Sequence, residues 1–163
     1  MLAFRVSTIV LVTMWAKPPA AHASQPPAKS QDFSKSSDAL ERRDQPVTEE
    51  DLRILQRADA ILSSAAVWNR HDTRICKPED RAWSLFCAME KASLDVLGEY
   101  RHREVALQEV RFAVEDVTKG VEFEHRMMDY NNLSSTSFED IKKILKVSTQ
   151  RVSDRLAAQK RKK

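Results

Sequence analysis

The scarcity of glycine most restricts what this chain can fold into. Only two glycines, Gly98 and Gly120, occur among 163 residues, whereas average usage is about 7%. Glycine supplies the positive φ angles that tight hairpin turns require, so a sheet built from many hairpins is disfavoured. Helices need little glycine, so we expect an all-α fold. The shares of 42% hydrophobic and 31% charged residues are typical of a soluble globular protein with one modest core.

The first 23 residues have the pattern of a secretory signal peptide. Arg5 provides the positive end, residues 6–16 form an apolar run, and Ala21 and Ala23 provide the small residues for cleavage after Ala23. The alternative is a membrane anchor, but this run is shorter than the ~20 residues that a spanning helix needs. We therefore expect export to the periplasm or the extracellular space.

A disordered linker is expected between the leader and the folded part. Residues 24–46 are rich in Ser, Pro, Gln, Lys and Asp, with Phe33 and Leu40 as their only large apolar residues. Such a segment cannot bury enough surface to offset the entropy lost on ordering. One helical domain is predicted over residues 47–159, followed by a basic tail at 160–163.

Four segments with helical spacing of apolar residues predict a small four-helix bundle. They are expected at about residues 51–66, 79–97, 103–120 and 136–156, joined by polar loops at 67–78 and 121–135. Thr48 is expected to cap the first helix. Thr136 and Glu139 have the spacing of a capping box that opens the last one.

Cys76 and Cys87 are the only cysteines. Because export would place them in an oxidising compartment, we expect a disulfide between them. The alternative is two buried thiols that pack as small apolar groups. We predict no metal and no cofactor, since the histidines are far apart in sequence and a disulfide would remove both thiolate ligands.

The two polar loops contain the candidates for catalysis. His71 and Asp72 lie in the first loop, and His125 and Asp129 lie in the second. If the loops meet, a histidine oriented by an aspartate could act as a general base in a small hydrolase. No nucleophile elbow or phosphate-binding glycine loop accompanies these residues, so we prefer structural roles for them and a non-catalytic protein.

The leading hypothesis is a binding protein that contacts a protein partner through a bundle face or its loops. The binding candidates in the loops are Trp68, Arg70, Tyr130, Asn131 and Asn132. A specific nucleic-acid partner is not expected, because no aromatic residues alternate with the cations of the tail. For the tail, a solvated helix end is preferred over contact with a membrane.

The order of these signals resembles a family of small bacterial and phage proteins known only as a domain of unknown function. The resemblance covers about residues 52–150, and its matching residues are Ala58, Trp68, Cys87, Ala88, Ala106, Tyr130, Asn131, Asn132 and Thr136 through Leu145. This chain departs from the family pattern at Asn132, where an aspartate is more usual, and by carrying a leader. The resemblance implies one helical domain and no particular activity.

Overall fold

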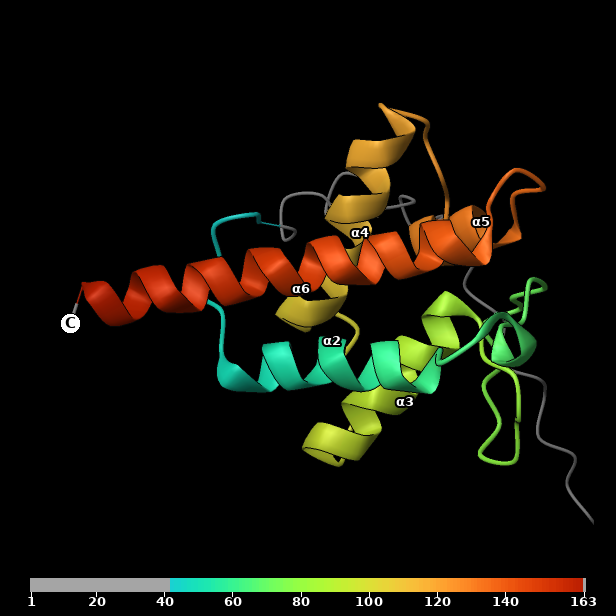
Figure 1. Cartoon of the computed structure of the whole chain (residues 1–163), viewed down its shortest axis with the longest axis horizontal. Helices are drawn as coiled ribbons and strands as arrows, with labels where there is room; N and C mark the ends of the chain where they lie inside the picture. The colour runs from blue at the N-terminus through green and yellow to red at the C-terminus, as the bar shows by residue number, and fades with distance from the viewer. Residues whose placement is uncertain (1–41, 163) are drawn as a thin grey trace, which may run out of the picture. The chain divides into compact units, whose positions relative to one another are not determined.

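Helices α2 (Glu49–Ile61) and α6 (Phe138–Arg161) lie side by side in the computed structural model, which describes residues 42–162 (Figure 1). At one end of the pair, the Lys160 ammonium lies 2.7 Å from the carboxylate of Glu49. At the other end, Lys142 donates a 3.1 Å hydrogen bond to the carbonyl oxygen of Leu62. The two helices are therefore antiparallel. The predicted signal peptide and the linker up to residue 41 lie outside the described residues.

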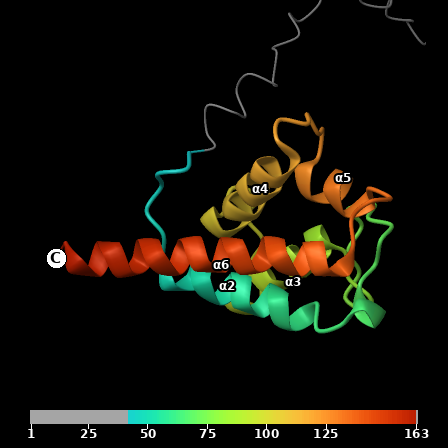
Figure 2. The same ribbon diagram turned by 45° about the horizontal axis from the view of Figure 1, so that its top comes forward.

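The other helices pack on this pair from one side (Figure 2). Helix α3 (Leu85–Leu97) contacts α2, and α4 (Val105–Thr118) contacts both α2 and α6. The short helix α5 (Arg126–Asn132) contacts α3 and α4. The all-α prediction is confirmed for residues 42–162, which contain the four expected helices, the additional α5 and a 3₁₀ turn, η1 (Ala65–Val67), but no strand.

The core comes from the apolar stripes that define the helices in the sequence. Burial of these side chains is the main favourable term that holds the five helices together. Fully buried members include Ile54 and Leu55 of α2, Leu85 and Met89 of α3, Leu107 and Val110 of α4, and Ile141, Ile144 and Leu145 of α6.

One buried carboxylate serves the first turns of two helices. Thr48 caps α2 as predicted, and Asp51 completes the capping box by accepting from the Thr48 backbone N–H at 2.8 Å. The other oxygen of Asp51 accepts a 2.9 Å hydrogen bond from the backbone N–H of Ala106 in the first turn of α4. Since Glu104, which precedes α4, makes no side-chain cap, Asp51 provides an acceptor that α4 lacks.

The second helix begins later than the expected residue 79. Residues 77–80 form a turn in which Asp80 accepts from the backbone N–H of Lys77 at 2.9 Å. Trp83 then forms a backbone bridge with Trp68. Ser84 caps α3 by accepting a hydrogen bond from the backbone N–H of Cys87 at 3.1 Å. These contacts hold residues 77–84 out of the helix.

The predicted loop at 121–135 was wrong in part, because it contains α5. The start of the last helix is also shifted by one residue, since Ser137 and Asp140, not Thr136 and Glu139, form its capping box. Thr136 instead donates its hydroxyl to the carbonyl oxygen of Tyr130 at 2.7 Å. The hydroxyl of Thr136 is thereby used within the α5 to α6 connection.

Both ends of the described chain contact the helical unit. Arg43, in the segment predicted as linker, lies 3.0 Å from Glu115 and 2.9 Å from Asp116 on α4. Helix α6 continues to Arg161 and so includes the first half of the predicted tail. Within residues 42–162, none of the helices combines the length and apolar character needed to span a membrane.

Candidate functional site

The two predicted polar loops meet at Asn131, a fully buried residue in the last turn of α5. Its side-chain oxygen accepts hydrogen bonds from the indole N–H of Trp68 at 2.8 Å and the backbone N–H of Leu85 at 3.1 Å. Its side-chain nitrogen donates to the carbonyl oxygen of Asn69 at 3.0 Å. Asn131 therefore connects α5 to the first loop and to the start of α3.

Asn132 adds a second connection between the same segments. Its side-chain oxygen accepts from the backbone N–H of Asp72 at 2.8 Å, and its nitrogen donates to the Asp72 carbonyl oxygen at 2.9 Å. Arg70 donates to the carbonyl oxygens of Leu133 and Ser134 at 3.0 and 2.8 Å. Side chains thus provide hydrogen-bond partners for backbone groups in the two irregular segments.

The aspartates of the two proposed His/Asp pairs bond to backbone amides. Asp129 accepts from the backbone N–H of His125 at 2.8 Å, and Asp72 accepts from the backbone N–H of Arg74 at 2.7 Å. The ring of His125 lies against the Arg74 guanidinium, with its nitrogens 3.0 and 3.2 Å from Nη1. His71 is exposed. This geometry favours structural roles for the two aspartates.

Three of the five binding candidates face inward. Asn131 and Tyr130 are buried, and burial raises the pKa of the Tyr130 hydroxyl. Trp68 is half-buried, with its ring centroid 6.1 Å from that of Phe138. Arg70 and Asn132 are exposed, but both hold the first loop in place.

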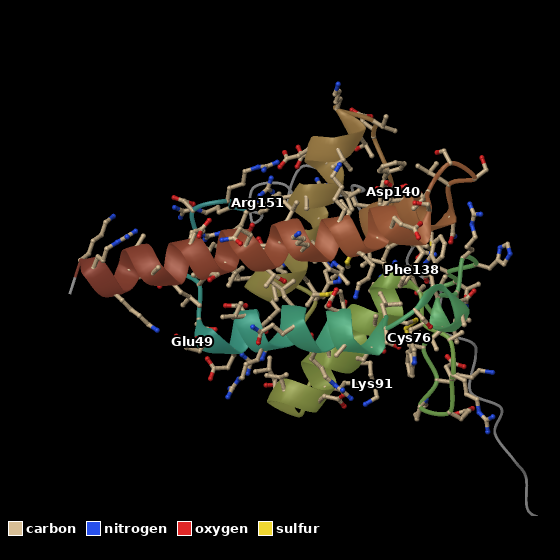
Figure 3. The ribbon with its side chains drawn as sticks, viewed as in Figure 1. Glu49, Cys76, Lys91, Phe138, Asp140 and Arg151 are labelled. Atoms are coloured by element: carbon tan, nitrogen blue, oxygen red, sulfur yellow. A yellow bond between two sulfur atoms is a disulfide. The ribbon has the colours of Figure 1, made fainter. Side chains whose placement is uncertain are left out.

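Residues 69–82 form an irregular segment that we call the disulfide loop. The predicted disulfide is present in the structure, and it joins Cys76 in the loop to Cys87 in the first turn of α3 (Figure 3). The two ends of the loop are brought together by the backbone bridge between Trp68 and Trp83. Together with Asn132, these contacts fix the loop at its ends and in its middle.

The outer side of the disulfide loop carries the most exposed large apolar side chain of the described residues. Ile75 is 67% exposed, and Lys77 and Arg81 are exposed nearby in the loop. These residues were missed as candidates. The available signal was a β-branched apolar residue beside a cysteine in an otherwise polar segment.

A second feature that sequence reasoning missed is a carboxylate oxygen buried within the loop itself. Asp72 is only 5% exposed, and its Oδ2 atom is buried with no hydrogen-bond partner in the described structure. Burial raises the pKa of Glu90 on α3, Arg74 opposes that shift, and the charge of Asp72 adds to it. Arg74 has a φ of 59° and places its guanidinium 5.2 Å from the centroid of the Phe86 ring. Arg74 thus lies near one buried carboxylate, Asp72, and one partly buried carboxylate, Glu90.

The comparisons with known proteins identify no relative: no family model, no curated protein and no solved structure matches the chain. The family resemblance described above therefore stays a prediction. Within residues 42–162, no three His, Cys, Asp or Glu side chains are grouped as metal ligands would be.

Proposed function

We propose that this chain is an exported, non-catalytic binding protein whose disulfide loop contacts a protein partner. The observation that carries the proposal is that a long irregular loop is held in place at several points while Ile75 faces outward. Irregular loops longer than about 12 residues are uncommon in compact domains, and they are usually either functional or disordered. The bonds that hold this loop in place favour a function.

The contacts that hold the loop also favour binding. Ordering a flexible loop or a long side chain at an interface costs free energy that subtracts from the affinity. The disulfide, the Trp68 bridge and the Asn132 pair restrict the loop before any partner arrives. The partner therefore meets a surface that needs little rearrangement.

The chemistry of the outer side indicates the kind of partner. Ile75 can enter a shallow apolar pocket, while Lys77 and Arg81 can contact acidic residues around that pocket. Charges at the rim of an interface mainly raise the association rate and the specificity. A protein surface with an apolar depression and an acidic rim fits this arrangement.

Export is part of the proposal, and two observations support it. The first 23 residues have the pattern of a cleavable leader. The disulfide between Cys76 and Cys87 would persist in an oxidising compartment and is uncommon in the cytosol. A small hydrolase remains the alternative function, but the bonds of Asp72 and Asp129 to backbone amides do not favour it.

The proposal is tested by affinity capture from the native envelope and medium. The loop variant Ile75→Ser/Arg81→Ser is compared with the control Leu94→Ser/Arg53→Ser, which changes an exposed leucine on α3 and an exposed arginine on α2. We expect the unchanged protein and the control to retain the same partner and the loop variant to lose it. A partner that both variants retain equally would show that another surface is used.

A further inference from the structure

A groove of about 750 Å³ runs along α2 and α6. Its volume is within the range of about 300–1,000 Å³ that is usual for ligand sites. Phe138 lies at the N-terminal end of α6, as Figure 3 shows. The residues that line the groove are Gln56 and Asp59 of α2 and Phe138, Glu139, Lys142, Lys143, Lys146, Thr149 and Gln150 of α6.

The three lysines of the groove differ in their partners. Lys142 is held between the helices, because its ammonium lies 2.5 Å from the Asp59 carboxylate and also donates to the carbonyl oxygens of Asp59 and Leu62. Lys143 and Lys146 are exposed, and neither forms an ion pair within the described part of the chain, although hydrogen bonds from Ser137 and the weaker effect of the Lys143 charge lower the pKa of Asp140. Two positive charges on one wall are therefore available to a ligand.

We infer that this groove binds an acidic peptide segment that carries one apolar side chain. Lys143 and Lys146 are three residues apart on α6, so their Cβ atoms are about 5–6 Å apart and can contact neighbouring carboxylates of one segment. Gln56 and Gln150 can bond to its backbone, and Phe138 provides an apolar contact for its side chain. Opposite charges would thus attract the peptide to the groove, and hydrogen bonds would favour segments with the matching backbone position.

The acids of the groove argue for a peptide over a continuous polyanion. Asp59 and Glu139 lie among the lysines, so a flat anionic membrane would bring negative charge against both. A peptide can place its carboxylates at Lys143 and Lys146 and leave neutral residues beside Glu139. Discrete charges in a concave site therefore fit better than a uniform anionic surface.

The test uses the full chain and a short fluorescein-labelled peptide of glutamates around one leucine, with binding followed by fluorescence anisotropy. We expect Lys143→Glu/Lys146→Glu to weaken binding by about tenfold or more, because it converts two attractions into repulsions. The matched control is Arg103→Glu/Lys119→Glu, which reverses two exposed charges outside the groove. Its binding should stay within about twofold of the unchanged protein, since distant surface charges are screened by salt.

Three outcomes would overturn the inference. The first is the absence of peptide binding, and the second is equal weakening by the groove variant and the control. The third is binding to phosphatidylglycerol vesicles, but not to the peptide, that depends on Lys143 and Lys146, which would assign the groove to a membrane. Lys143→Gln/Lys146→Gln provides a milder variant if the charge reversal impairs folding. The loop variant Ile75→Ser/Arg81→Ser should bind the peptide normally, so this inference and the proposed function fail separately.

Discussion

The indole N–H of Trp68 donates a 2.8 Å hydrogen bond to the side-chain oxygen of Asn131, although 63 residues separate the two in the chain. This bond and the two hydrogen bonds between Asn132 and Asp72 join the two polar segments to each other. The amide of Asn131 is fully buried, whereas Ile75 in the disulfide loop is 67% exposed.

The first prediction concerns the buried amide. Asn131→Ala would leave the Trp68 indole N–H, the Leu85 backbone N–H and the Asn69 carbonyl without their partner. Each unsatisfied buried group costs about 1–3 kcal/mol, and because water can enter the gap we expect a total loss of about 3 kcal/mol in the free energy of unfolding. Urea denaturation followed by circular dichroism measures this change.

Asn132→Ala is the matched comparison, because it removes the neighbouring amide at an exposed position. Water can replace its two bonds to Asp72, so we expect a loss of only about 1 kcal/mol. If Asn132→Ala were the more destabilising of the two, the central role given to Asn131 would be wrong.

The helices could be predicted from the sequence because their signals are local. The apolar stripes through Leu55, Met89, Val110 and Leu145 recur at helical spacing, and all four side chains are buried. Helix boundaries were less accurate where two signals compete. Thr136 has the spacing of an N-cap, but its hydroxyl bonds to Tyr130, and the next residue caps the helix instead.

The arrangement of the loops could not be predicted, since it depends on contacts between segments far apart in sequence. Asn131 and Asn132 were expected in a polar loop at residues 121–135. They are instead the last two residues of α5, and their side chains bond to Trp68, Leu85 and Asp72. Asp51 is similar, because its bond to Ala106 appears only once α2 and α4 are packed.

The second prediction concerns the disulfide. Cys76→Ser/Cys87→Ser removes a cross-link between residues 11 positions apart. In the chain-entropy model, a cross-link that closes a loop of this length contributes about 2–3 kcal/mol to the free energy of unfolding. Since α3 does not depend on the cross-link for its cap, the helical circular dichroism should remain. Amide hydrogen exchange should become faster in the disulfide loop and change little in α6. Unchanged stability together with unchanged exchange in the loop would contradict the role assigned to the disulfide.

The third prediction concerns the pH dependence of stability. Burial raises the pKa of Glu90, so its charged form is disfavoured in the folded protein. The folded protein therefore holds the proton of Glu90 more tightly than the unfolded chain does. This contribution to stability is complete below the ordinary pKa of a glutamate and is lost as the pH rises through the raised pKa. Glu90→Gln removes this loss, so we expect the variant to be more stable at neutral pH by less than about 1 kcal/mol.

Thermal unfolding at neutral pH and at about pH 4 measures the effect, and the advantage of Glu90→Gln should shrink in acid. Glu122→Gln, which removes an exposed carboxylate from the connection between α4 and α5, corrects for the general loss of a negative charge. An advantage for Glu90→Gln that is the same at both pH values would rule out the proposed effect of burial.

The most direct test of the central claim, that the disulfide loop contacts a protein partner, is site-specific photocrosslinking in the native envelope and medium. A photoreactive phenylalanine replaces Ile75 in one variant and Leu94, which is 43% exposed on α3, in the other. We predict that light joins one protein partner to the variant at position 75 and leaves the variant at position 94 largely uncrosslinked. Crosslinking of that partner at position 94 but not at position 75 would contradict the account.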